Sequence, residues 1–500
     1  MTNTARQNPS VAVIGAGMTG ILMAIKLREA GITDITILEK ADKLGGTWRE
    51  NTYPGVACDV PAHMYTYSFR GNPEWQHRFA HGDEIQEYFE QVADEHGITG
   101  KIRFGEPLEK CHYRDGKWQL TTGKGDQFEV DFVVSATGIL HHPAYPDIQG
   151  LDRFQGKMWH TARWNHDVDL AGKRVGIIGT GSTAAQVIGE IAKSTGHLTV
   201  FQRTPQWIVS VPDKDYSEQD KAKLRGKQGK MVALSKRYAF TMRNTFTKGV
   251  SGGKLQHALL SWAAKRNLRK SVRDPELRAR LTPDYAVGCK RLIINSTFYE
   301  AVQRDNVSLE TTGISRISEK GIVTADGVEH ELDVLILATG FSPFNFMRPM
   351  DLKGRNGLDI NEAWANKIQA YRSVSIPGFP NFFLMLGPHS PIGNYSVIAM
   401  SEVQTAYILK LIEHWKQGTL ETVEATEEAK VRFNNYLRKG MGNTAWVGGC
   451  QSWYLDGDGD PALWPYTWQQ WEKELQEPEL DDFHRRAPAE EDQEPLRPAA

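Results

Sequence analysis

The pattern of apolar and polar positions near the start of the chain predicts a strand, a turn, a helix and a second strand. A run of apolar residues at 11–14 ends in a glycine-rich turn at 15–20, and apolar positions then recur with helical spacing over 21–30. A second apolar run follows at 35–38. Short apolar runs bounded by glycine are typical of buried strands, so this region is predicted to form a βαβ unit.

The same pattern returns further along the chain. Residues 174–178 are mostly apolar, 179–184 form a glycine turn, 185–193 have helical spacing, and 198–201 are apolar again. Two βαβ units so far apart in sequence indicate two separate doubly wound domains. We therefore predict an α/β fold with two Rossmann-like dinucleotide-binding domains, for FAD and NADP, and a helical insertion.

Two similar segments, 132–138 and 334–340, are apolar runs that both end in Ala-Thr-Gly. They lie on either side of the second βαβ unit, as expected of two buried strands at which the chain crosses between domains. The acidic, proline-rich end of the chain is typical of disorder. The predicted division is a first dinucleotide domain of residues 1–145 and 336–477, a second of 146–213 and 281–335, a helical insertion at 214–280, and a disordered tail at 478–500.

Residues 214–280 differ from the rest of the chain in charge. They are rich in lysine and arginine, poor in acidic residues, and helical in pattern. A basic helical surface is compatible with binding to a membrane surface. The simpler interpretation, which we prefer from the sequence, is a solvated helical cap over the active site.

The overall composition restricts the class of protein. The chain of 500 residues is long enough for two or three domains, and its formal net charge of -2 gives no reason to expect a nucleic acid partner. Its apolar runs are too short for a transmembrane helix, and residues 1–10 are too few and too polar for a signal peptide. We expect a cytoplasmic protein, and the sequence leaves its oligomeric state open.

The cysteines exclude several kinds of chemistry. They are far apart, and none belongs to a CxxC pair: Cys58, Cys111, Cys289 and Cys450. This spacing argues against a structural zinc site, a secreted disulfide scaffold and a dithiol redox enzyme. No metal site is predicted. Excluding a dithiol redox enzyme matters, because the flavin disulfide reductases also contain dinucleotide fingerprints.

The first glycine turn has the spacing of a dinucleotide-binding fingerprint. Gly15, Gly17 and Gly20 allow a tight turn and a close approach of the backbone to a pyrophosphate, which binds at the helix N-terminus. Glu39 ends the next strand, where an acid binds a ribose hydroxyl. The complete arrangement predicts a dinucleotide site.

The second glycine turn is similar but ends differently. The residues expected to contact a dinucleotide there are Gly179, Thr180, Gly181, Ser182 and Ala184. The following strand ends in Arg203 and Thr204, where an NAD site would have an acid. Because a guanidinium binds a 2′-phosphate through two hydrogen bonds, NADPH is predicted over NADH.

Two dinucleotide sites on one chain indicate a relay of electrons. Hydride passes from nicotinamide to a second redox cofactor, for which FAD is the simplest candidate. Without a CxxC pair to receive the electrons, O2 is the simplest acceptor.

A segment between the fingerprints, residues 154–164, has the pattern FxGxxxHTxxW. It resembles the signature FxGxxxHTxxWP of the Baeyer–Villiger monooxygenases, in the flavin-containing monooxygenase superfamily. One position departs from that signature, because Asn165 stands where the family usually has Pro or Asp. The resemblance implies that His160 and Trp164 couple the two domains and do not transfer protons.

A longer segment, GGTWxxxxYPGxxxD at residues 45–59, resembles the family pattern [AG]GxWxxxx[FY]P[GM]xxxD at every fixed position. In the family this segment turns beneath the flavin. The resemblance implies that Thr47, Trp48, Asp59 and Tyr65 line the FAD.

The segment GCKRL at residues 288–292 is similar to the family's active-site Lys-Arg segment. The resemblance implies that Lys290 approaches the NADP phosphate and that Arg291 lies over the flavin, held by Asp59. A fixed positive charge suits this place, since it stabilises an anionic intermediate without donating a proton.

The aromatic segment 446–454 resembles a mobile loop whose tryptophan contacts the nicotinamide ribose, which makes Trp453 the candidate. The resemblance implies an enzyme that uses NADPH and O2 to convert a ketone to an ester or lactone through a C4a-peroxyflavin, with Arg291 and Asp59 as its catalytic pair. The alternatives are an N- or S-oxygenating flavin monooxygenase and a non-catalytic flavoprotein redox sensor.

Overall fold

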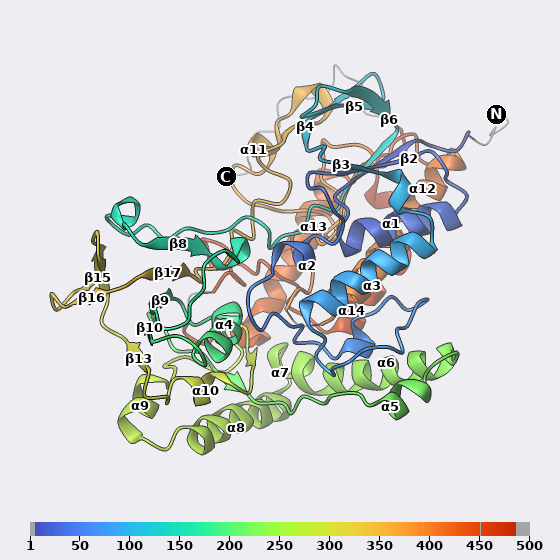
Figure 1. Cartoon of the computed structure of the whole chain (residues 1–500). Helices are drawn as coiled ribbons and strands as arrows, with labels where there is room; N and C mark the ends of the chain where they lie inside the picture. The colour runs from blue at the N-terminus through green and yellow to red at the C-terminus, as the bar shows by residue number, and fades with distance from the viewer. Residues whose placement is uncertain (1–5, 394, 451, 487–500) are drawn as a thin grey trace.

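The computed structural model describes residues 6–393, 395–450 and 452–486, and two separate parallel sheets organise it (Figure 1). In the first sheet the strand order is β19-β7-β1-β2-β3, and every neighbouring pair is parallel. Its strands are β1 (Val11–Ile14), β2 (Ile35–Glu39), β3 (Ile102–Phe104), β7 (Phe132–Ser135) and β19 (Phe382–Leu384).

The second sheet repeats this architecture with the order β13-β10-β9-β17-β8, again with parallel neighbours. Its strands are β8 (Lys157–His160), β9 (Arg174–Ile178), β10 (His197–Phe201), β13 (Val307–Glu310) and β17 (Val334–Leu337). Parallel strands joined by helices are the doubly wound arrangement, so the predicted fold class is confirmed.

The two fingerprint helices are α1 (Met18–Glu29) and α4 (Ser182–Ile191). Both begin three residues before the helical pattern predicted, because Gly17 and Gly181 are their N-caps and the fingerprint residues form the first turn. Eight of the twelve residues of α1 are buried, since the helix packs between the first sheet and a C-terminal helix, α12 (Val397–Lys416).

The two Ala-Thr-Gly segments each support the fingerprint of their own sheet. Gly15 has a φ of +105°, and a Cβ there would lie 2.6 Å from the carbonyl oxygen of Ala136. Gly179 has a φ of +113°, and its Cβ would lie 2.5 Å from the carbonyl oxygen of Ala338. After each segment the chain leaves one sheet for the other part of the molecule, which explains why the two runs look alike.

Smaller elements surround these sheets. The minor strands are β4 (Leu108–Arg114), β5 (Lys117–Thr122), β6 (Gln127–Val130), β18 (Asp351–Lys353), β14 (Ile314–Ile317), β15 (Gly321–Thr324), β16 (Glu329–Glu331), β11 (Ile208–Val209) and β12 (Ile293–Ile294). The other helices outside the insertion are α2 (Thr47–Glu50), α3 (Gly82–Glu95), α10 (Phe298–Ala301), α11 (Ile360–Ala363), α13 (Glu427–Gly440) and α14 (Trp468–Glu474).

The insertion is helical, and Figure 1 shows it along the lower edge of the molecule. Its helices are α5 (Glu218–Ala222), α6 (Gln228–Met242), α7 (Lys248–Val250), α8 (Lys254–Ser271) and α9 (Pro275–Arg280). The inner face of α8 is buried through Ala264 and Leu268, which pack in the core of the second sheet's domain.

The predicted disordered tail is wrong for its first part. Phe483 is buried, and the buried carboxylate of Asp482 accepts hydrogen bonds from Tyr371 and Arg432. Residues 478–486 therefore belong to the fold, because their few apolar and charged side chains have partners that composition does not reveal. Residues 487–500 lie outside the described part. Among the described helices, none combines the length and apolar character needed to cross a membrane.

Candidate active site

A cavity of about 870 Å³ lies between the two fingerprints. The predicted site residues that line it are Gly15, Gly17, Glu39, Thr47, Trp48, Asp59, Tyr65, Gly181, Ser182, Ala184, Arg291 and Trp453. The predicted residues outside its lining are Gly20, Gly179, Thr180, His160, Trp164, Arg203, Thr204 and Lys290. The structure thus brings together segments from both dinucleotide domains and the C-terminal part of the chain.

Both fingerprint helices point an uncapped end at the cavity. Gly17 begins α1 and Gly181 begins α4, and neither helix has a side chain that caps its first backbone N–H groups. Uncapped N–H groups at a helix N-terminus bind phosphate oxygens. The residues present therefore fit two dinucleotides, one on each side of the cavity.

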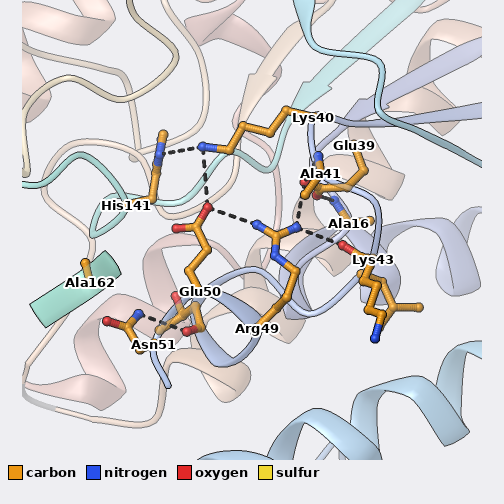
Figure 2. A network of polar contacts seen from close by, with 12 residues as sticks. Ala16, Glu39, Lys40, Ala41, Lys43, Arg49, Glu50, Asn51, His141 and Ala162 are labelled. Carbon is orange, nitrogen blue, oxygen red and sulfur yellow. Dashed lines mark hydrogen bonds and ion pairs between the residues drawn. The ribbon is translucent and has the colours of Figure 1, made fainter. Parts of the chain in front are cut away.

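Glu39 organises the first fingerprint (Figure 2). Its Oε2 accepts a hydrogen bond of 2.8 Å from the backbone N–H of Ala16, and its Oε1 accepts one of 3.0 Å from the N–H of Ala41. Arg49 Nη1 also donates to Oε1 at 3.0 Å. The carboxylate that was expected to bind ribose therefore also fixes the shape of the glycine turn.

The same network continues to the linker between the domains. Arg49 Nη2 lies 2.9 Å from Oε1 of Glu50, and Lys40 Nζ lies 3.5 Å from the same atom. Arg163, beside the predicted coupling residues, is 3.7 Å from Glu50 Oε2. Burial lowers the pKa of His141 to about 3, so this neutral imidazole accepts a hydrogen bond of 3.4 Å from Lys40 (Figure 2).

The aromatic residues of the flavin-lining segment form one cluster. Trp48 Nε1 donates a hydrogen bond of 3.2 Å to Tyr65 Oη, and their rings meet edge to face at 5.6 Å. Tyr65 Oη in turn contacts the sulfur of Met18, in the first turn of α1, at 3.4 Å. Trp48 and Tyr65 are thus held against the fingerprint helix, and Thr47 precedes Trp48 at the start of α2.

Arg291 and Asp59, which the motifs predict to act together, are in direct contact. Arg291 Nη2 donates a hydrogen bond of 2.6 Å to Asp59 Oδ2, although 232 residues separate them in sequence. Both side chains are partly exposed to the cavity, 33% for Arg291 and 24% for Asp59. The charge of Asp59 raises the pKa of the Arg291 guanidinium, so this group stays charged at every accessible pH.

A second group of cations lies at the second fingerprint. Thr180 Oγ1 donates to the carbonyl oxygen of Thr204 at 3.0 Å, which ties the glycine turn to the segment that carries Arg203. Burial lowers the pKa of Lys290, and the nearby charge of Arg203 lowers it further. Neither cation forms an ion pair with any described residue. The charge of Asp284 offsets only part of this effect on the pKa of Lys290, and two close cations fit a phosphate dianion between them.

His160 lies where the chain crosses between the sheets. Its ring centre is 5.7 Å from that of Tyr145, on the first crossing, and 5.9 Å from that of Phe341, on the second. Its Nδ1 accepts a hydrogen bond of 3.1 Å from the N–H of Ala162, and burial lowers its pKa. Trp164 packs edge to face on Trp159 of β8 at 5.6 Å. These positions favour a role in domain coupling.

A disulfide joins the two segments that are predicted to contact the nicotinamide coenzyme. Cys289, beside Lys290 and Arg291, is bonded to Cys450, in the segment that carries Trp453. The two cysteines are 161 residues apart, so the sequence contained no local signal for the pair. Disulfides are rare in a reducing cytosol, so the cytoplasmic location stays a prediction.

The comparisons with known proteins agree with this geometry. Residues 8–415 match the family model described as flavin-binding monooxygenase-like. The chain belongs to this family. It is 46% identical over 459 residues to an uncharacterized monooxygenase of Mycobacterium tuberculosis, with 92% of both chains covered. It is 38% identical over 484 residues to a Baeyer–Villiger monooxygenase of Streptomyces coelicolor, covering 96% of this chain and 93% of the relative.

Among solved structures, an oxidized steroid monooxygenase bound to NADP superimposes with a TM-score of 0.84 and 30% identity, covering 94% of this chain and 97% of that one. The resemblance inferred from the motifs is therefore confirmed, as is the enzyme class, an FAD-containing and NADPH-dependent monooxygenase of the Baeyer–Villiger type.

The motifs also did not predict a contact between Tyr53 and the second domain of the monooxygenase. Tyr53 Oη donates to Gln186 Oε1 at 2.9 Å, and Gln186 Nε2 donates to the carbonyl oxygen of Ala57 at 2.9 Å. A Cβ on Gly55 would lie 2.8 Å from Cγ of Glu190, on the same helix α4. The Tyr-Pro-Gly part of the motif thus forms a contact between domains. The one signal in the sequence was a polar Gln186 on the fingerprint helix.

The expected helical cap over the active site is wrong for this monooxygenase. Residues 214–280 are described throughout, and none of them lines the cavity. The insertion instead packs through α8 on the second domain and through α6 on the first, where Gln228 Oε1 accepts a hydrogen bond of 3.2 Å from the N–H of Gly71. One group of possible metal ligands, His77, His81 and Glu84, occurs among the described residues, but Glu84 Oε1 already accepts a hydrogen bond of 2.6 Å from His77. The absence of a metal site stays a prediction.

Replacing Arg203 by alanine is expected to reduce the preference for NADPH over NADH. The lost charge-assisted hydrogen bond to a phosphate contributes about 1.5–3 kcal/mol, which is roughly 10- to 150-fold in the ratio of kcat/KM values. Steady-state flavin reduction with both coenzymes measures this ratio. Arg304→Ala, an exposed arginine of the same domain, is the control, and an unchanged ratio in Arg203→Ala would mean that Arg203 does not contact the phosphate.

The thiol content should match one disulfide and two buried free cysteines, Cys58 and Cys111. In protein purified without reductant and denatured with guanidinium, we expect two titratable thiols per chain, and four after reduction. A thiol-specific dye measures both values. Four thiols without reduction would contradict the bond between Cys289 and Cys450.

Proposed function

We propose that this monooxygenase converts ketones to esters or lactones with NADPH and O2. The observation that carries the proposal is the pair of Arg291 and Asp59 at the cavity that both fingerprints share. The streptomycete relative is named for the Baeyer–Villiger reaction, and the steroid monooxygenase was determined with NADP bound. Gly15, Gly17 and Glu39 would hold the FAD, and Gly181, Arg203 and Lys290 would hold the nicotinamide coenzyme.

Reduced FAD, when bound, would react with O2 and so provide the oxygen atom that is transferred. Insertion of that atom next to a ketone carbonyl develops negative charge on oxygen. Arg291 stabilises such charge, because its guanidinium is fixed by Asp59 and keeps its proton. A group that released a proton there would quench the oxygen transfer.

The walls of the cavity help to keep the site dry. Trp453 lines the cavity, and its ring packs edge to face on Tyr454 at 4.8 Å. Burial raises the pKa of Tyr454 to about 12, so its hydroxyl stays neutral near Arg291. Water exclusion strengthens the field of Arg291 and limits unproductive release of hydrogen peroxide.

The experiment is product analysis with NADPH, O2 and a panel of linear, cyclic, aryl and steroid ketones. The proposal predicts an ester or lactone from at least one class, with NADPH consumed in proportion. A sulfide and a tertiary amine belong in the same panel. Turnover of these two without ester from any ketone would favour N- or S-oxygenation, and NADPH oxidation without any oxygenated product would contradict the proposal.

A further inference from the structure

The strongest feature that the oxygenation chemistry does not use is the charge of the insertion. Between Lys221 and Arg273 the sequence contains fifteen lysine and arginine residues and no aspartate or glutamate. The whole chain has a formal net charge of -2, so the remainder is acidic. Such segregation places a strong positive potential on one part of the surface.

The outer face of α8 adds large apolar side chains to this charge. Leu255, Leu259 and Trp262 are 68%, 57% and 59% exposed. Their spacing of four and three residues places them on one face of the helix. Phe240, near the end of α6, is 63% exposed, so the insertion carries four of the eight large apolar side chains that are most exposed among the described residues.

The same face continues as a basic surface. Arg266, Arg269 and Lys270 are exposed and follow Trp262 at helical spacing. The guanidinium of Arg266 lies 5.6 Å from the ring centre of Trp262. None of these three cations forms an ion pair with a described residue. We call Leu255, Leu259, Trp262, Arg266, Arg269 and Lys270 the α8 face.

We propose that the α8 face binds the surface of a membrane that contains anionic lipids. An interfacial helix needs apolar side chains that enter the boundary of headgroups and acyl chains, together with cations that meet the phosphates. The α8 face has both, and its opposite side is fixed to the protein through Ala264 and Leu268. The apolar side chains of the α8 face can therefore enter the lipid boundary without unfolding of the domain.

Other occupants fit the α8 face less well. A nucleic acid would use the cations but not an exposed Leu-Leu-Trp stripe. In a symmetric dimer the same patch meets itself, which would bring uncompensated cations of the two copies together. A lipid surface satisfies the apolar and the charged parts at once.

Membrane docking would leave the chemistry unchanged. No residue of the insertion lines the cavity. His257 of α8 contacts the carbonyl oxygen of Val287 at 2.9 Å, four residues before Arg291, but the residues of the α8 face take no part in that contact. The proposal concerns where the enzyme lies and does not depend on which substrate it oxidises. A failure to bind membranes would therefore not contradict the proposed oxidation of ketones.

The test is flotation of the FAD-loaded full chain with vesicles of phosphatidylcholine, alone or mixed with phosphatidylserine. We expect binding to the mixed vesicles, weak binding to phosphatidylcholine, and loss of binding at high salt. The triple variants Leu255→Ser/Leu259→Ser/Trp262→Ser and Arg266→Gln/Arg269→Gln/Lys270→Gln should each lower the bound fraction about tenfold or more. Val328→Ser/Val431→Ser, which removes exposed apolar side chains elsewhere, should bind like the unmodified chain.

A second measurement reports contact by the helix itself. With brominated lipid in the vesicles, Trp262→Phe should keep its binding and lose part of the tryptophan quenching. Absence of binding to mixed vesicles, or binding of both triple variants at the level of the unmodified chain, would overturn the proposal. So would a dimer that the serine variant dissociates, or tight binding to duplex DNA that only the glutamine variant loses. In every variant the FAD content and the rate of NADPH oxidation should stay unchanged.

Discussion

Arg291→Ala is expected to lower the rate of ester formation by roughly 10²–10³-fold while the protein keeps its FAD. The guanidinium pairs with Asp59 at 2.6 Å and is the group placed to stabilise negative charge during oxygen transfer. Reduction of FAD by NADPH precedes oxygen transfer and forms no charged oxygen on the substrate, so NADPH oxidation should continue and release hydrogen peroxide. Arg291→Lys should recover little, because a flexible ammonium does not reproduce the planar guanidinium.

The measurement is NADPH, ester and hydrogen peroxide in the same sample, with FAD content from the absorption spectrum. Arg316→Ala replaces an exposed arginine of the β14 strand and should behave like the unmodified enzyme. A near-normal yield of ester from Arg291→Ala would contradict the role given to Arg291. Loss of flavin reduction as well would show that Arg291 also positions the nicotinamide.

Gly20→Ala should yield a protein that does not retain FAD. A Cβ at this position would lie 1.9 Å from the carbonyl oxygen of Gly15. The fingerprint turn would therefore have to move away from α1. Displacement of the turn moves the backbone N–H groups that would bind the pyrophosphate. We expect little yellow colour after purification and a loss of NADPH oxidation of roughly 10²-fold or more, since misplacement by about 1 Å has effects of that order.

Gly229→Ala is the matched control, because Gly229 is also inside a helix but a Cβ there meets nothing within 4 Å. Alanine stabilises an exposed helix relative to glycine, so this variant should retain FAD and fold at least as well. Thermal unfolding of both variants, with and without added FAD, separates loss of the cofactor site from general instability. Full FAD content in Gly20→Ala would contradict the geometry of the fingerprint.

The pattern of apolar residues and glycines predicted the strands and helices that depend on neighbouring residues in the sequence. The strands at 11–14 and 174–178 were predicted from apolar runs, and the fingerprint helices from glycine and helical spacing. The helix starts were late by one turn, because glycines inside a first turn look like a loop in sequence. Asp59 and Arg291 could be predicted as a pair from the family motifs alone, since 232 residues separate them.

Other features depend on contacts that the sequence does not encode locally. The bond between Cys289 and Cys450 and the contact between Tyr53 and Gln186 arise only when both domains are in place. The insertion was expected to cover the cavity, but it packs on the second domain through α8 and on the first domain through α6. The part of the tail that includes Asp482 and Phe483 was expected to be disordered, because overall composition does not show which few side chains are buried.

The most direct test of the central claim is oxygenation under ¹⁸O₂ with NADPH and the ketone that the enzyme oxidises fastest. Mass spectrometry of the product should show an ester or lactone with one ¹⁸O atom, formed in proportion to the NADPH consumed, and Arg291→Ala should form little of it. NADPH consumption that yields only labelled hydrogen peroxide, or label found only in sulfoxides and amine oxides, would contradict the account.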